Sequence, residues 1–137
     1  QEAFSDPQIS RISIGIWEEG FSLLSKLGIK LAPLPGFPVE NVTQLISMPK
    51  EEAARVFSGI ISKLSKDPLY GSILQSIKRG RISEIDYING EFVNLAGKNN
   101  LTCPLNKILV ELVHKVEKDR KFLTKEEFLS RINPLLN

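Results

Sequence analysis

Apolar residues recur at helical spacing along nearly the whole chain. In the first stretch they form one stripe, which comprises Ile9, Ile12, Ile16, Leu23, Leu24 and Leu27. Such spacing is typical of an amphipathic helix. Asp6 before Pro7 is a start signal, because its side chain can cap the first turn and proline tolerates the first helical position. Gly28 is the matching stop.

The middle of the chain shows the same periodicity with clear interruptions. Prolines at 33, 35 and 38 make residues 30–38 a loop, which we expect to pack inside one domain. Short helices are expected at about 39–46 and 70–79, the second broken by Gly80. Between them, Ser47 and Pro49 introduce a helix that ends at Asp67-Pro68. Its stripe comprises Ala53, Val56, Phe57, Ile60, Ile61 and Leu64.

The last third of the chain contains two further start signals. Ser83 with Asp86, and Thr124 with Glu127, both fit a capping box, in which two residues three apart satisfy each other's main-chain N–H groups. Between the boxes, a stripe from Leu105 to Val116 predicts another helix, and Gly97 and Pro134 are expected stops. Alternating strand patterns do not occur. We therefore expect one all-α domain of six or seven helices over residues 1–137.

Composition excludes several classes of protein. The 137 residues are 42% hydrophobic and 25% charged, with a net charge of +2, which does not suit disorder or a strongly basic nucleic-acid binder. No apolar run approaches the roughly 20 residues of a membrane helix. The single cysteine, Cys103, cannot form an internal disulfide, which favours a reducing, cytoplasmic location.

Common cofactor and metal motifs do not occur in the sequence. There is no GxGxxG or GxxxxGK[ST] turn. With one cysteine and one histidine, no metal site of the usual kind is expected. His114 lies opposite the apolar stripe of its helix, which indicates a surface residue. Cys103 has no base near it in sequence, which indicates a packed residue rather than a nucleophile.

Polar groups concentrate between residues 71 and 89, GSILQSIKRGRISEIDYIN. Glu84 and Asp86 are two positions apart on a helix, so they should point to different sides and not act as an acid/base pair. Glu84 would lie in the first turn, where the helix dipole favours a charged acceptor. Asn89 is either a satisfied core amide or a functional group. The basic trio, Lys78, Arg79 and Arg81, is either a solvated face or an anion contact.

Residues 71–113 resemble the signature region of the ketopantoate reductase (2-dehydropantoate 2-reductase) family. The family pattern is a serine, then G-R-x-T-E-I-D-Y-x-N-G, then a P-x-N helix start. Here it reads as Ser72, GRISEIDYING over 80–90, and Pro104-Leu105-Asn106. A weaker likeness reaches back to about Phe4 and forward to Val116. Residues 121–137 look like an extension without a counterpart.

The resemblance implies an enzyme that reduces ketopantoate to pantoate with NADPH, for pantothenate and coenzyme A biosynthesis. Such enzymes join an N-terminal Rossmann domain to a helical C-terminal domain similar to that of 6-phosphogluconate dehydrogenase, and substrate lies between them. The family's substrate-contacting positions fall on Ser72 and Glu84. By that analogy Ser72 binds the substrate carboxylate, and Glu84 holds a substrate hydroxyl or the catalytic lysine.

The sequence also departs from the family pattern. The helix that carries the family's catalytic lysine and a substrate-binding asparagine has no match in this chain, and neither has the cofactor domain. Ser76 stands where aspartate is usual, which puts a local polar contact in doubt, and Ser83 replaces a common threonine.

The favoured hypothesis is a C-terminal substrate domain that acts on ketopantoate or a related 2-keto acid. Alone it would be inactive and bind no cofactor, and its partners would be a Rossmann domain and, in a homodimer, a second copy. The alternative is a stand-alone helical interaction or dimerisation module that has lost catalysis. A nucleic-acid or other polyanion binder is disfavoured, because three cations neutralise few phosphates, and no membrane partner is expected.

Overall fold

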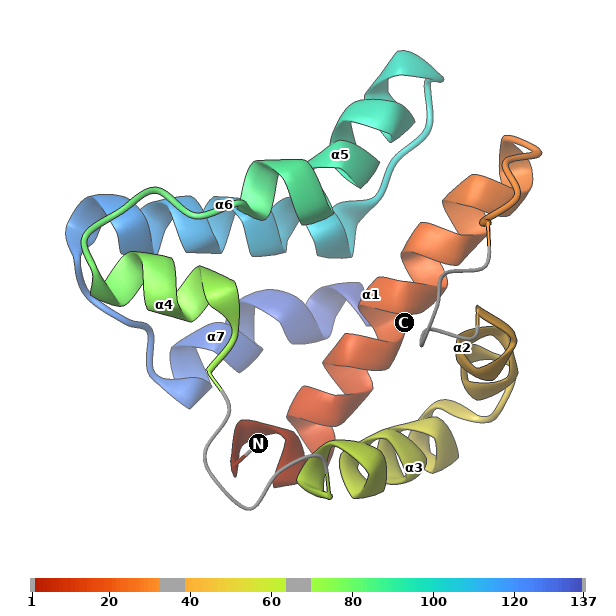
Figure 1. The fold of residues 1–137 in the computed structure, drawn as a ribbon, viewed down its shortest axis with the longest axis horizontal. Coiled ribbons are helices and arrows are strands. Elements are labelled where there is room, and N and C mark those ends of the chain that lie inside the picture. The colour runs from red at the N-terminus through yellow and green to blue at the C-terminus, as the bar shows by residue number, and fades with distance from the viewer. Residues whose placement is uncertain (1, 33–38, 64–69, 137) are drawn as a thin grey trace. The chain divides into compact units, whose positions relative to one another are not determined.

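A computed structural model describes residues 2–32, 39–63 and 70–136 (Figure 1). The chain divides into two compact units, residues 1–69 and residues 70–137. Within the described ranges there are seven α-helices and two short 3-10 helices, and no strand. The predicted all-α class is therefore confirmed. The grouping of residues 1–137 as one domain stays a prediction, and each unit is described here by itself.

The first unit consists of a 3-10 turn and three helices: Glu2–Ser5, α1 (Pro7–Lys26), α2 (Val39–Ile46) and α3 (Lys50–Ser62). The start signal of α1 is confirmed, because the Asp6 side chain accepts a hydrogen bond from the main-chain N–H of Gln8 at 2.9 Å. Gly28 follows the helix with φ +67°, a left-handed conformation that glycine adopts without strain. The short helix α2 has its predicted bounds.

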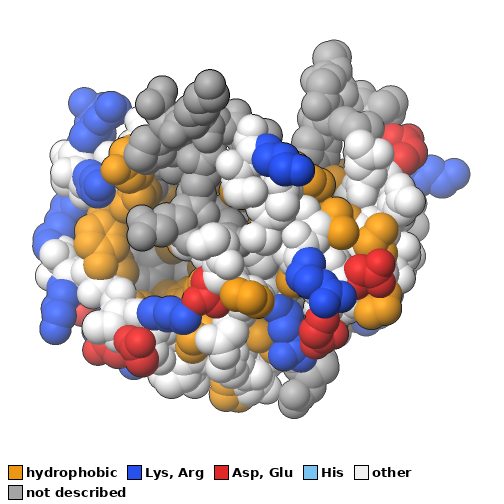
Figure 2. All heavy atoms as spheres, turned by 90° about the horizontal axis from the view of Figure 1, so that it is seen from below, with side chains coloured by type: hydrophobic (Ala, Val, Ile, Leu, Met, Phe, Trp, Pro, Cys, Tyr) orange, Lys and Arg blue, Asp and Glu red, His pale blue; other side chains and the backbone are white. Residues whose placement is uncertain are grey.

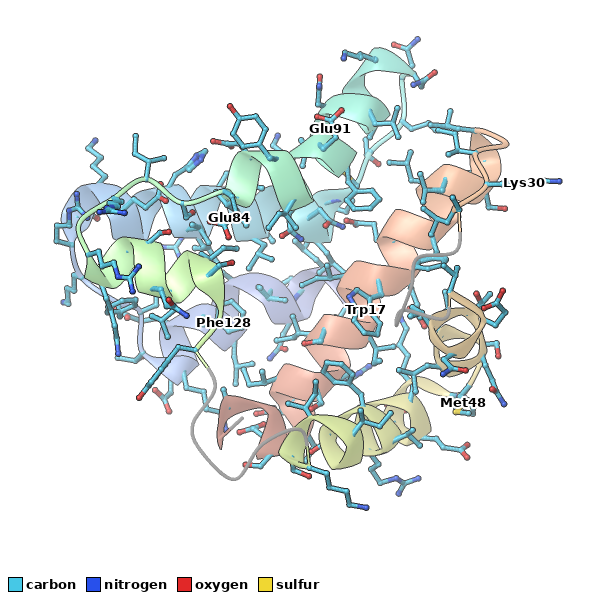
Figure 3. The ribbon with its side chains drawn as sticks, in the orientation of Figure 1. Trp17, Lys30, Met48, Glu84, Glu91 and Phe128 are labelled. Carbon is cyan, nitrogen blue, oxygen red and sulfur yellow. The ribbon has the colours of Figure 1, made fainter. Side chains whose placement is uncertain are left out.

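The core of this unit is mostly apolar, although Ser10 on α1 is also fully buried. A cluster of buried residues comprises Ile14, Leu45, Ala53 and Phe57, and Trp17, Met48 and Ile61 pack against them. Trp17 on α1, labelled in Figure 3, meets Phe57 on α3 edge to face, with ring centroids 5.2 Å apart. Two side chains of the predicted stripe on α3 are not buried: Val56 is 40% exposed and Ile60 52% exposed. The buried residues of α3 are Ala53, Ala54 and Phe57, and Ile61 is partly buried against the same cluster.

Some predictions for the first unit lie outside the described residues. These are the proline-rich part of the 30–38 loop and the Asp67-Pro68 stop of the third helix. Leu64, the last member of the α3 stripe, lies there too. The described part of α3 ends at Ser62.

The second unit contains α4 (Ser72–Lys78), α5 (Ile85–Lys98), α6 (Pro104–Asp119), α7 (Lys125–Ile132) and a 3-10 turn at Asn133–Leu135. Gly80 interrupts the chain after α4 with φ +72°, as predicted. The Thr124–Glu127 capping box at the start of α7 is confirmed in both directions. Helix α5 continues past the expected stop at Gly97 to Lys98, and the turn at Asn99-Asn100 follows.

The predicted capping box at Ser83 is wrong. The N-cap residue of α5 is Glu84, and no side chain caps this helix. The Ser83 hydroxyl instead accepts a long hydrogen bond, 3.4 Å, from the main-chain N–H of Ile85. Asp86 does not reach back, because its carboxylate pairs with His114 on α6 at 3.1 Å. His114 on the neighbouring helix has thus replaced the main-chain N–H of Ser83 as the partner of Asp86.

Helices α5 and α6 lie side by side and run antiparallel (Figure 1). Their buried apolar residues are Ile85, Ala96, Leu105, Leu112 and Val116. Residues 121–137 include α7, which packs on α6 and buries Leu129 and Ile132. The segment that looked like an extension is therefore part of the folded second unit.

Candidate functional site

The structure brings together the two residues that sequence analysis selected as a site. Ser72 is the first residue of α4, and Glu84 is the N-cap of α5, with the turn at Gly80 between them. The Ser72 hydroxyl donates a hydrogen bond to the Glu84 carboxylate. Glu84 lies on the side of α5 that faces α4 (Figure 3). Ser72 and Glu84 are twelve positions apart in the sequence, and the turn at Gly80 brings their side chains together.

The environment of Glu84 favours its charged form. The hydrogen bond from Ser72 lowers the pKa of Glu84, and a hydrogen bond from its own main-chain N–H lowers the pKa further. Donors that bind a carboxylate stabilise the anion over the acid. Glu84 is therefore an acceptor of hydrogen bonds or a partner for a cation at neutral pH, and not a proton donor.

Asp86 belongs to a different face of the same helix. Its carboxylate lies 3.1 Å from Nε2 of His114, and the two side chains are about half exposed. Glu84 points to Ser72 and Asp86 to His114, so the prediction that they do not form an acid/base pair is confirmed. His114 is exposed as expected, but it is not solitary, because it joins α6 to the first turn of α5.

Asn89 has a protein partner. Its Nδ2 donates to Oδ1 of Asn106 on α6 at 2.9 Å, and Asn106 is 1% exposed. A buried amide must be paired, and here the Asn89 Nδ2 pairs with the Asn106 oxygen across the helix interface. Of the two readings left open for Asn89, the structure favours the satisfied amide.

The basic trio lies at the end of α4 and just beyond it. Lys78 stands over the ring of Tyr70 at 4.5 Å, a cation–π contact. Arg120, after α6, donates to the carbonyl of Gly80 at 3.0 Å and so adds a fourth cation to the same turn. Figure 2 shows Lys and Arg side chains gathered at its left edge, the side on which α4 and the end of α6 lie in Figure 1.

Sequence reasoning missed one contact beside the site. The main-chain N–H of Ser83 donates to Oε1 of Glu117 on α6 at 2.7 Å. The two residues are 34 positions apart, and Glu117 belongs to no motif. Its only local signal is a negative charge near the C-terminal end of a helix, where the dipole disfavours it.

The described part of the chain offers no metal centre. No group of three His, Cys, Asp or Glu side chains is placed to hold a metal ion among residues 2–32, 39–63 and 70–136. Cys103 is buried at the N-cap of α6. None of the helices described is long and apolar enough to cross a membrane.

Comparison with known proteins identifies the family. Residues 1–117 match the family described as the C-terminal domain of ketopantoate reductase, PanE/ApbA type. This chain belongs to that family. The likeness expected from the GRISEIDYING segment is therefore confirmed, and the ketopantoate reductase family match covers all of the first unit and most of the second. The expected similarity to 6-phosphogluconate dehydrogenase stays a prediction.

Two curated relatives are 2-dehydropantoate 2-reductases. The protein of Pyrococcus abyssi is 48% identical over 44 residues, which are 32% of this chain and 15% of that protein. The protein of Pyrococcus horikoshii is 31% identical over 106 residues, which are 77% of this chain and 29% of that protein. The chain thus spans less than a third of these relatives. No solved structure gives a significant match.

Proposed function

We propose that this chain is the C-terminal substrate-binding domain of an NADPH-dependent ketopantoate reductase, which reduces ketopantoate or a related 2-keto acid to its hydroxy acid. The observation that carries the proposal is the hydrogen bond between Ser72 and Glu84. These are the two positions that the family resemblance assigns to substrate, and they come from separate helices.

The chemistry of the pair suits a 2-keto acid that also bears a hydroxyl. A serine hydroxyl has one proton, so Ser72 can donate either to Glu84 or to a substrate carboxylate. When Ser72 donates its proton to a substrate carboxylate, Glu84 loses its hydrogen-bond donor. Glu84 then needs a new donor or cation, because the two nearby carboxylates also repel one another. The substrate hydroxyl or a lysine ammonium would supply it. Binding would therefore replace the Ser72–Glu84 hydrogen bond by a bond from Ser72 to the substrate carboxylate and a new bond to Glu84.

NADPH, when bound, supplies the hydride for this reaction. The described residues do not fit it, because they contain no strand that leads through a glycine-rich turn into a helix. We therefore propose that a Rossmann domain outside this chain holds the cofactor and that a lysine outside this chain is the proton donor. The 137-residue chain alone should not oxidise NADPH. A cytoplasmic location and a homodimer are part of the same proposal.

The proposal can be tested on the chain itself by titrating ¹⁵N-labelled protein with ketopantoate. We expect chemical-shift changes centred on Ser72 and Glu84, which Ser72→Ala and Glu84→Gln weaken. Ser130→Ala is the matched control, because the Ser130 hydroxyl bonds only a carbonyl of its own helix. In the full-length protein, Ser72→Ala should chiefly raise KM, since it removes a substrate contact. Glu84→Gln should chiefly lower kcat.

The opposite results would count against the proposal. If the chemical-shift changes were the same in Ser72→Ala and Glu84→Gln as in wild type, ketopantoate would bind elsewhere. No shift with ketopantoate at any concentration, together with a mass that doubles as protein concentration rises, would favour the stand-alone interaction module.

A further inference from the structure

We propose that Glu117 is a positioning residue, which holds the start of α5 so that Glu84 stays within reach of Ser72. The role depends on the proposed function of the Ser72–Glu84 pair. The contact that carries it is the 2.7 Å hydrogen bond from the main-chain N–H of Ser83 to Oε1 of Glu117. Ser83 immediately precedes Glu84, so the bond fixes the chain one residue before the site.

Local contacts do not hold this segment by themselves. The N-cap of α5 has no side-chain cap, and the hydrogen bond to the Ser83 hydroxyl is long at 3.4 Å. The turn at Gly80, three residues upstream, is held by bonds from the Arg81 N–H to the Ser76 carbonyl and from Arg120 to the Gly80 carbonyl, but neither bond reaches Ser83. Ile85, 1% exposed, anchors the chain after Glu84. Glu117 is the anchor before it.

Glu117 stands where local preference disfavours it. It lies in the last turn of α6, near the negative end of that helix. A residue that breaks a local rule often answers a tertiary demand. Here the demand comes from the main-chain N–H of Ser83, a residue that is 6% exposed. Without Glu117 this N–H would be buried with no acceptor, which costs free energy. A charged acceptor makes a stronger bond to that N–H than a neutral one.

The two possible roles of Glu117 predict opposite changes in the pKa of Glu84 when Glu117 is replaced. If Glu117 acts only through its negative charge, removing that charge relieves repulsion and lowers the pKa of Glu84. If it positions Glu84, removing the acceptor loosens the contact with Ser72. Loss of that hydrogen bond raises the pKa of Glu84 toward its ordinary value. The sign of the change therefore separates the roles.

The experiment is a ¹³C-carboxylate NMR titration of Glu84 in the 137-residue chain, with no ligand. Ser72→Ala gives the pKa of Glu84 without its serine partner. Glu117→Gln keeps an acceptor and removes the charge, whereas Glu117→Ala removes both. Glu117→Asp keeps the charge on a side chain one methylene shorter. Glu111→Ala is the matched control, an exposed glutamate of the same helix whose partner is Lys107.

We expect Glu117→Ala and Glu117→Asp to raise the pKa of Glu84 toward its value in Ser72→Ala, and the Ser83 amide to lose its protection from hydrogen exchange. In Glu117→Gln the pKa of Glu84 should lie at or below its wild-type value, because the amide oxygen still accepts from Ser83. In Glu111→Ala the pKa of Glu84 should not change. A pKa that falls or stays constant in both Glu117→Ala and Glu117→Asp would overturn the proposal. If the alanine variant does not fold, the aspartate variant decides. Neither outcome depends on substrate or turnover, so the proposed function is tested separately.

Discussion

The two units of this chain differ in the contacts that hold the helices of each unit together. The first unit packs α1, α2 and α3 around a small apolar cluster centred on Phe57. Its cross-helix polar contacts include two partly exposed ion pairs between α1 and α3, Arg11–Glu51 and Lys50–Glu18. The second unit also buries aliphatic residues, but four polar pairs surround its helix α5. They are Asn89–Asn106, Asp86–His114, Ser83–Glu117 and Ser72–Glu84.

This difference matters because the two kinds of contact do different work. Apolar burial stabilises roughly in proportion to area and tolerates small shifts. Hydrogen bonds depend steeply on distance and angle, so they fix where individual atoms lie. The candidate site is in the second unit, where such bonds meet around the start of α5. Changes in the first unit should therefore alter stability, and changes in the second should also alter the site.

The largest effect should come from the apolar cluster. Phe57→Ala removes a 6%-exposed side chain from the core and from contact with Trp17, which should cost about 3–5 kcal/mol. Urea unfolding followed by Trp17 fluorescence measures it. Ile60→Ala, on the same helix and 52% exposed, should cost less than about 1 kcal/mol. Equal costs for the two variants would mean that the cluster is not the core.

A smaller loss is expected at the amide pair. Asn106→Ala leaves the Asn89 amide without its partner, which should cost about 1–3 kcal/mol. Replacing both amides by leucine should cost less than the single change, because the Asn89 amide is then not left without its partner. Denaturant unfolding of the three proteins checks this. A double variant that is less stable than Asn106→Ala would contradict the polar account of this interface.

The capping box of α7 should contribute less again. Thr124→Ala removes the hydroxyl that accepts from the N–H of Glu127, at a cost of about 1 kcal/mol. Thr102→Ala, at an exposed loop position, is the control and should be near neutral. Thermal unfolding by circular dichroism compares the two. No difference between them would show that the box does not stabilise the folded chain.

The smallest effect is a pH dependence at Glu84. Because the pKa of Glu84 is lowered in the folded chain, its contribution to stability is present above its ordinary pKa of 4.5 and is lost as the pH falls through the lowered value. Wild type should therefore lose more stability than Glu84→Gln on acidification below that pH. Unfolding at a series of pH values measures both slopes. Parallel slopes would mean that the Ser72 hydrogen bond does not persist in solution.

Much of the helical layout could be predicted from the sequence. Asp6-Pro7, Gly28, Gly80 and Thr124–Glu127 marked helix ends correctly, because caps and left-handed turns depend on residues within one helical turn of each other. The same reasoning failed at Ser83. There the capping partner, Asp86, had a competing partner on another helix, and local sequence carries no information about it.

The candidate site divides in the same way. The residues Ser72 and Glu84 and the family followed from a motif that lies within one continuous stretch of sequence. That the Ser72 hydroxyl contacts the Glu84 carboxylate, that Asn106 satisfies Asn89, and that Glu117 holds Ser83 were decided by tertiary structure alone. The physical reason is range: periodicity and capping act over a few residues, whereas these bonds depend on how α6 packs beside α5 and on where the Gly80 turn leaves α4.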